Sequence, residues 1–178
     1  MKQLCLVLNF VVVSQMLEQV NGTTKIEFLA SRVRFNPKHF SNLTLFTENS
    51  AIYADIMVVK PLRQGFKANV EFKLRLNNSK THQKLFNHVL DVCDMLVGLR
   101  KTIFRKWFES ILKYSNFMQN CPVPEGHYYL RDWRPDASII PAYLFAGDYR
   151  IRGYCFYGNY KKKNMEFLID MEVDAVIS

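Results

Sequence analysis

The chain has 178 residues, a formal net charge of +8, an apolar share of 49% and an aromatic share of 14%. An apolar share of this size excludes a disordered protein. In the cytosol the positive charge would suggest a nucleic-acid partner, whereas in a secreted protein it favours an acidic surface, an anionic lipid headgroup or an acidic ligand.

The first 22 residues have the pattern of a secretory signal peptide. Lys2 supplies a positive start, and an apolar run follows from Leu4 to Val13. This run is about half of the roughly 20 residues that a membrane-spanning helix needs, and no second run of its length follows. We therefore expect residues 1–22 to be removed, the protein to be secreted, and residues 23–178 to form one domain.

Two stretches in the first half of the mature chain have the pattern of β-strands. Apolar and polar residues alternate over 66–76, which predicts a long strand with one dry and one wet face. Residues 51–60 form a second strand candidate, which ends at Pro61. The sequence RQG between the two is a plausible turn, so we expect a hairpin.

One segment, around residues 100–115, has the pattern of an amphipathic helix. Its apolar side chains recur at the spacing of a single helix face: Ile103, Phe104, Trp107, Phe108, Ile111 and Leu112. Further strand patterns follow this segment, without strand–helix alternation. The order predicts a mainly β fold, an antiparallel two-sheet β-sandwich with one inserted helix.

The C-terminal part of the chain predicts a second hairpin. Apolar and polar residues alternate on both sides of the polar sequence NYKKKN, residues 159–164. Across this turn Arg150 and Arg152 would face Glu172 and Asp170. Opposite charges in these positions would stabilise the register by a few tenths of a kcal/mol each.

Cysteines and sequons agree with export. Cys93, Cys121 and Cys155 remain after the leader, and this odd number leaves one bridge and a spare thiol, or a bridge between two molecules. Asn42 and Asn77 stand in N-glycosylation sequons, and we expect both to be glycosylated.

Catalytic motifs are absent from the sequence. It has no G-x-S-x-G, no Gly-rich phosphate loop, and no Cys or His pair at metal-binding spacing. Asp91 and Asp94 flank Cys93, but no second group completes a catalytic site. We therefore expect no enzymatic activity, no cofactor and no metal.

The excess of large apolar side chains has two interpretations. They fill a closed core, or they line a cavity between the sheets, where an apolar ligand would gain about 0.8 kcal/mol per buried methylene. For a cavity we expect the lining Phe72, Leu74, Phe104, Trp107, Phe108, Ile111, Tyr149, Ile151, Phe167 and Ile169, with Arg100, Lys101, Arg105 and Lys106 near an acidic headgroup.

Four short motifs follow one another along the chain: Asp91–Cys93, Ser115–Asn116, Cys121–Pro122 and Gly147–Tyr149. In this order they resemble a large family of small secreted insect proteins with one conserved domain of unknown function, which includes the CheB chemosensory proteins. That family is distantly similar to the ML lipid-recognition superfamily. The resemblance covers most of the mature chain.

The resemblance implies an ML-like or immunoglobulin-like β-sandwich, no enzymatic activity, and binding of an apolar ligand such as a lipid or a pheromone. It also implies a disulfide between Cys93 and Cys121, with Cys155 as a competitor. Members of the family usually carry two more cysteines near the start, which this chain lacks. Cys155 is then an inert core thiol in a monomer, or the site of a covalent dimer.

Together these features predict a secreted, non-catalytic binding protein for a hydrophobic small molecule. Its further partners would be a membrane surface or a receptor, and not nucleic acid. The alternative is an extracellular protein–protein interaction module with a closed core and no ligand cavity.

Overall fold

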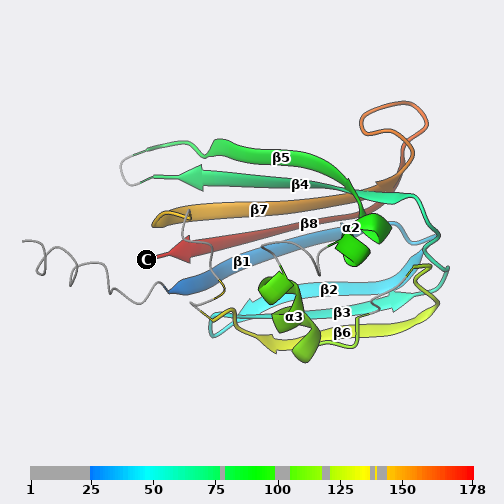
Figure 1. Ribbon diagram of the computed structural model, residues 1–178, viewed down its shortest axis with the longest axis horizontal. Helices are drawn as coiled ribbons and strands as arrows, with labels where there is room; N and C mark the ends of the chain where they lie inside the picture. The colour runs from blue at the N-terminus through cyan, green and yellow to red at the C-terminus, as the bar shows by residue number, and fades with distance from the viewer. Residues whose placement is uncertain (1–24, 77–78, 99–104, 118–120, 137–138, 140–143) are drawn as a thin grey trace, which may run out of the picture.

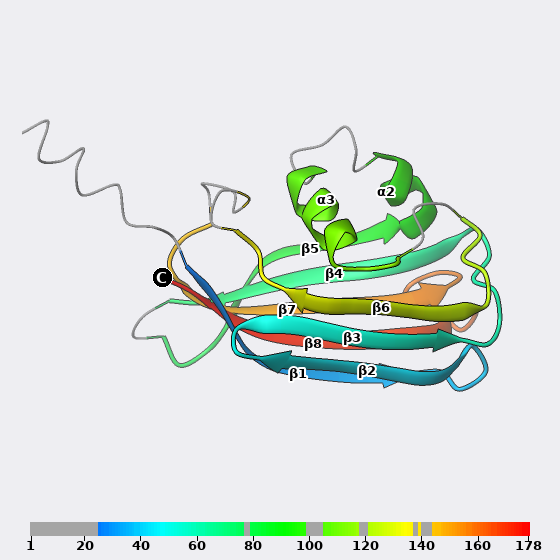
Figure 2. The same cartoon turned by 90° about the horizontal axis from the view of Figure 1, so that it is seen from below.

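The computed structural model describes residues 25–76, 79–98, 105–117, 121–136, 139 and 144–178. Two antiparallel sheets face each other in an open sandwich (Figures 1 and 2). The strands are β1 (Ile26–Phe35), β2 (Phe40–Glu48), β3 (Ala51–Val58), β4 (Phe66–Arg75), β5 (Gln83–Asp91), β6 (Gly126–Trp133), β7 (Gly147–Tyr157) and β8 (Glu166–Ile177), and the helices are α2 (Val92–Gly98) and α3 (Arg105–Lys113). One sheet has the order β1-β8-β7-β4-β5 and the other the order β2-β3-β6. The predicted two-sheet β fold is thus confirmed.

The two long sides of the sandwich differ. On one side β1 and β2 lie against each other, and the hydroxyl of Ser31 donates to the backbone oxygen of Leu45 at 2.9 Å. On the other side α2 contacts β4 and β5, while α3 contacts β6. Figure 2 shows both helices on this same side of the molecule. The helices therefore occupy the side on which β5 and β6 form the edges of the two sheets.

The predicted C-terminal hairpin is present, but its register is shifted by two residues of β8 from the predicted one, so that Arg150 lies opposite Asp174. β7 pairs with β8, and Arg152 lies directly opposite Glu172. Both expected ion pairs are present, Arg152 Nε to Asp170 at 2.7 Å and Arg150 Nε to Glu172 at 3.5 Å. Arg150 also reaches Asp174 at 2.7 Å. These pairs lie on the outer face, so the inner face of the hairpin is left to apolar side chains.

The predicted first hairpin is wrong. β3 pairs with β2 and β6, whereas β4 pairs with β5 and β7, so the two strands belong to different sheets. Between them Leu62 forms a β-bridge with Val123, with both N–H···O distances at 2.9 Å. Strands of two facing sheets bury the same kind of face, and alternation therefore does not reveal which sheet a strand joins.

A second helix, α2, was not predicted from the sequence. Asp91 caps its first turn, and Oδ1 accepts the backbone N–H of Cys93 at 3.0 Å and that of Asp94 at 3.2 Å. Seven residues are too few to produce a recognisable helical period. α3 lies within the expected helical region, whose first part, residues 100–104, is outside the described residues. No helix in the described part of the chain is long and apolar enough to cross a membrane.

The cysteine-free segment near the beginning of the described chain forms β1 and β2. β1 pairs along β8 from Ile26 opposite Ile177 to Phe35 opposite Ile169. Lys25 and Ser178 exchange two backbone hydrogen bonds, at 2.8 and 3.0 Å, beyond the end of this ladder. Strand pairing therefore anchors the beginning of the described chain without a disulfide.

Candidate ligand cavity

An apolar cavity of about 390 Å³ lies between the two sheets. The small sheet contributes the inner positions of three strands, β8 contributes three residues of the large sheet, and both helices contribute from the side. The lining comprises Phe40, Leu43, Leu45, Ile52, Ala54, Ile56, Val58, Leu62, Phe66, Val92, Leu96, Phe108, Phe117, Val123, Tyr128, Leu130, Trp133, Ile169, Met171 and Val173.

The period of two in β3 explains why this strand contributes most. Ile52, Ala54, Ile56 and Val58 are alternate residues, so all four point to the same face of the small sheet. β3 is the central strand of that sheet, and it pairs on both sides. Its backbone polar groups are therefore used within the sheet, and only side chains reach the cavity.

Among the lining residues only Tyr128 and Trp133 carry a side-chain group that forms strong hydrogen bonds. The Tyr128 hydroxyl donates to the backbone oxygen of Pro124 at 3.0 Å. The Trp133 indole N–H donates to the Ser110 hydroxyl at 3.1 Å. Both groups are thus occupied, and the cavity offers a ligand an essentially hydrocarbon surface.

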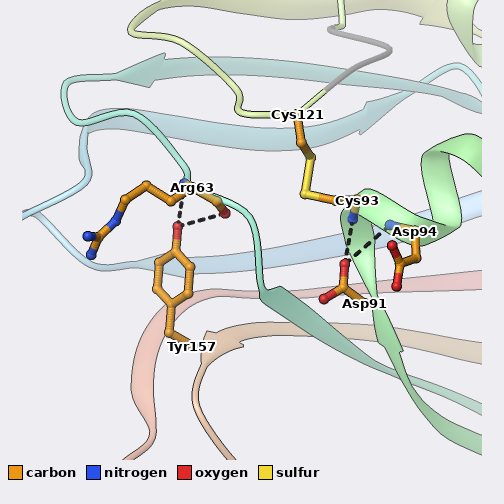
Figure 3. Close-up of a disulfide and its surroundings, with 6 residues drawn as sticks. All are labelled: Arg63, Asp91, Cys93, Asp94, Cys121 and Tyr157. Carbon is orange, nitrogen blue, oxygen red and sulfur yellow. Dashed lines mark hydrogen bonds between the residues drawn. A yellow bond between two sulfur atoms is a disulfide. The ribbon is translucent and has the colours of Figure 1, made fainter.

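The disulfide between Cys93 and Cys121, which the resemblance implied, is present (Figure 3). Cys93 follows Val92 in α2, and Cys121 lies two residues before Val123. Both valines line the cavity, so the bridge fixes two parts of its wall to each other. Closing a loop of 28 residues contributes roughly 3–4 kcal/mol in the chain-entropy model.

A pair of hydrogen bonds between Tyr157 and Arg63 lies beside the disulfide. The Tyr157 hydroxyl accepts the backbone N–H of Arg63 at 2.7 Å and donates to the carbonyl of the same residue at 3.3 Å (Figure 3). Arg63 follows Leu62, another lining residue that is bridged to Val123. Burial raises the pKa of the Tyr157 hydroxyl, which keeps it protonated and able to donate. This end of the cavity is therefore held by a β-bridge between two connecting segments and by the Tyr157 side chain of the large sheet.

Of the ten residues expected to line a cavity, Phe108 and Ile169 are in the observed lining. Trp107 and Ile111 pack instead around the cluster that contains Trp133, and Trp107 meets the Trp133 ring edge-on at 4.9 Å. Phe104 lies outside the described residues. The apolar face of α3 thus divides between the cavity and the neighbouring core.

The other five residues lie elsewhere. Leu74 and Tyr149 form a separate core cluster with Ile177, and Ile151 is opposite Phe72 within the large sheet. Phe72 contacts the ring of Phe86, with centroids 6.2 Å apart, and Phe167 contacts that of Tyr154 at 5.5 Å. The lining therefore lacks five of the expected residues: Phe72, Leu74, Tyr149, Ile151 and Phe167.

Sequence reasoning missed most of the observed lining, and half of that lining comes from the small sheet. The available signal was the alternation of Ile52, Ala54, Ile56 and Val58. The predicted hairpin pairs this strand with residues 66–76. Because the two strands of a hairpin belong to one sheet, that prediction places both of them in the same wall of the cavity. Placing β3 in the facing sheet moves these residues to the opposite wall of the cavity.

The two predicted headgroup residues that the structure describes, Arg105 and Lys106, are not part of the lining. Arg105 is exposed and pairs with Glu109 at 2.7 Å along α3. Lys106 lines a separate, polar pocket of about 380 Å³ together with Lys113 and Arg134. Phe108 and Lys106 are two residues apart on the helix and therefore point in roughly opposite directions. Arg100 and Lys101 lie outside the described residues.

The remaining described candidate sites are a surface asparagine and a free thiol. Asn42 is exposed on β2, whereas Asn77 lies outside the described residues, as do residues 1–22, for which the sequence predicts a signal peptide. Cys155 is a free thiol at the edge of the core, and burial raises its pKa to about 12. Within the described ranges, no group of three or more His, Cys, Asp or Glu side chains is placed to hold a metal ion.

Residues 68–151 match the family described as "Protein of unknown function (DUF1091)". The matched segment runs from β4 into β7 and includes both helices and the disulfide. No curated protein matches the chain. The comparison thus supports a domain of unknown function that contains the cavity walls only in part, because β2, β3 and β8 all lie outside the match.

Proposed function

We propose that this protein is a secreted, non-catalytic binding protein for a hydrophobic small molecule, which it holds between its two sheets. The observation that carries the proposal is the cavity of about 390 Å³, lined by apolar side chains whose two hydrogen-bonding groups are already occupied. Ligand pockets in proteins commonly measure about 300–1,000 Å³. A well-packed core would instead leave few voids larger than a water molecule.

The energy of burial is comparable with the cost of binding such a ligand. A chain of about twelve methylenes would gain roughly 10 kcal/mol at about 0.8 kcal/mol each. Association costs on the order of 4–15 kcal/mol in lost freedom of motion. The gain lies within the range of the cost, so an aliphatic ligand of this size binds with useful affinity only if it fills the cavity well.

Three features favour an extracellular setting. The leader pattern of residues 1–22, the exposed Asn42 sequon and the Cys93–Cys121 disulfide are all typical of exported proteins. The motif order resembles that of the secreted insect proteins that include CheB, and the sandwich agrees with an ML-like lipid-binding fold. A lipid or a pheromone-like compound is the ligand class that this resemblance adds.

Native mass spectrometry of the secreted protein tests the proposal. We expect a non-covalent adduct of a few hundred daltons, lost on denaturation and recovered in a solvent extract. Ala54→Leu, which adds three carbons inside the cavity, should abolish the adduct, because Ala54 lines the cavity and is 6% exposed. Ala30→Leu, on an exposed position of β1, is the matched control and should retain it. A bare wild-type chain, also after incubation with lipids, would refute the proposal.

A second candidate function is that of an extracellular interaction module, and β5 favours it. All seven residues from Gln83 to Val89 are exposed, although β5 is hydrogen-bonded to β4. Leu85, Phe86 and Val89 are 53%, 46% and 38% exposed. Exposed apolar residues on an edge strand are typical of a surface that receives another chain. If the protein is an interaction module, we expect Phe86→Lys to abolish its complex with the partner protein and Ala54→Leu to leave that complex intact.

A further inference from the structure

The size and chemistry of the cavity restrict the class of ligand that fits. We propose that the ligand is a single neutral aliphatic chain of about a dozen carbon atoms, recognised through its hydrocarbon alone and without a headgroup site among the residues that the structure describes. This inference rests on the proposed function and narrows it. It excludes fatty-acid anions and two-chain lipids as preferred ligands.

Volume sets the length of the chain. A water molecule occupies about 30 Å³ in the liquid, and a methylene takes up a similar volume. The cavity of about 390 Å³ therefore holds roughly 13 non-hydrogen atoms. One chain of that length fills it, whereas a diacyl lipid of equal chain length has about twice as many atoms.

The described lining residues offer a ligand no free polar partner. The hydroxyl of Tyr128 donates to Pro124, and the indole N–H of Trp133 donates to Ser110. β3 and β8, which together supply seven of the twenty described lining residues, each have a partner strand on both sides, so their backbone groups bond within the sheets. A ligand hydroxyl or carboxylate placed in the cavity would thus lose its water without gaining a partner.

The described positively charged side chains near the cavity also point away from it. Arg150 and Arg152 lie on the outer face of the large sheet, where they pair with Asp174 and Asp170 at 2.7 Å. On α3, Arg105 pairs with Glu109, and Lys106 belongs to the polar pocket on the side of the helix opposite Phe108. A carboxylate inside the cavity therefore meets no described positive side chain, and the cost of its desolvation is not offset.

Competition binding on the full mature protein tests the inference. The fluorescent probe is N-phenyl-1-naphthylamine, and the competitors are methyl esters and sodium salts of straight-chain acids from 8 to about 20 carbons, with didodecanoylglycerol as a neutral two-chain lipid. We expect ester affinity to rise with chain length up to about 12–14 carbons and then to stop rising. Methyl dodecanoate should bind at least about tenfold more tightly than dodecanoate and than the two-chain lipid.

The competition experiment distinguishes failure of the inference from failure of the proposed function. Dodecanoate binding as tightly as its ester, or affinity that keeps rising to 20 carbons, would overturn the inference and leave the proposed function standing. If neither the probe nor any competitor binds, the proposed function itself fails, and the inference with it.

A variant pair supplies an independent measurement. Val173→Thr adds a hydroxyl to the lining while keeping the shape of the side chain, and Val176→Thr makes the same change at a position of β8 outside the lining. We expect Val173→Thr to raise the affinity of dodecan-1-ol relative to methyl dodecanoate by about fivefold, and Val176→Thr to leave the ratio unchanged. An unchanged ratio in Val173→Thr, with the thermal midpoint retained, would contradict binding in this cavity.

Discussion

Trp133 of β6 donates its indole N–H to the Ser110 hydroxyl of α3 at 3.1 Å, which joins the small sheet to the helix beside the cavity. Trp133 is 3% exposed and lines the cavity, and Trp107 packs edge-on against its ring. The bond serves two purposes, because it satisfies a buried donor and fixes α3 over the side of the sandwich.

Ser110→Ala should therefore destabilise the protein. The buried indole N–H would lose its acceptor, and an unsatisfied buried donor costs about 1–3 kcal/mol. Chemical denaturation followed by tryptophan fluorescence measures the change. Ser41→Ala, on an exposed position of β2, is the control and should stay within about 0.5 kcal/mol of wild type. Equal stability of the two variants would show that the bond does not hold α3.

The disulfide makes a separate prediction. Replacing both Cys93 and Cys121 by serine should lower the free energy of unfolding by roughly 3 kcal/mol, because the bridge closes a loop of 28 residues. It should also weaken ligand binding, since the bridge holds α2 and Val123 at the cavity wall. Thermal unfolding with and without ligand measures both effects. Loss of stability with unchanged affinity would show that the bridge is needed for folding only.

Cys155 should be chemically inert in the folded protein. Burial raises the pKa of its thiol to about 12, so almost no thiolate is present at neutral pH, and the thiolate is the reactive form. We expect alkylation by iodoacetamide at pH 8 to occur only on unfolding, and the protein to remain a monomer without reductant. Rapid alkylation of the native protein, or a reducible dimer lost in Cys155→Ser, would show that the thiol is accessible.

The parts of the fold that could be predicted from the sequence are those encoded locally. The C-terminal hairpin has alternation, a polar turn and opposite charges such as Arg152 and Asp170 within one short stretch. The Cys93–Cys121 bridge followed from the resemblance rather than from spacing, because Cys155 was an equal candidate. β5 escaped prediction because seven of its residues are exposed and its apolar residues do not alternate with polar ones.

The lining of the cavity depended on information that the sequence does not carry locally. Phe72 and Ile56 lie in equally convincing strands, yet only Ile56 reaches the cavity. The difference comes from the sheet that each strand joins and from the way the large sheet extends beyond the small one toward β5. Such long-range pairing is set by the whole chain, so residue pattern alone identified apolar faces but not which of them enclose a common space.

Asp55 should make stability depend on pH in the acid range. Its carboxylate accepts hydrogen bonds from Arg131 at 2.6 and 2.7 Å, and these, with a contact to His127 at 2.7 Å, lower its pKa to about 2. The unfolded chain binds this proton near pH 3.8, so the folded state gains stability from the ionised group above that pH. As the pH falls from about 4 to about 2, the unfolded state takes up the proton first and this stability is lost.

Asp55→Asn removes that contribution and should give a flatter stability profile over this range. Urea denaturation at half-unit steps from pH 2 to pH 6 measures the profile, and Glu125→Gln, on an exposed residue, is the matched control for loss of one carboxylate. Wild type should exceed Asp55→Asn in stability at pH 6, and the difference should shrink toward pH 2. A difference that is constant with pH would show that Asp55 acts through packing or hydrogen bonding that its ionisation does not influence.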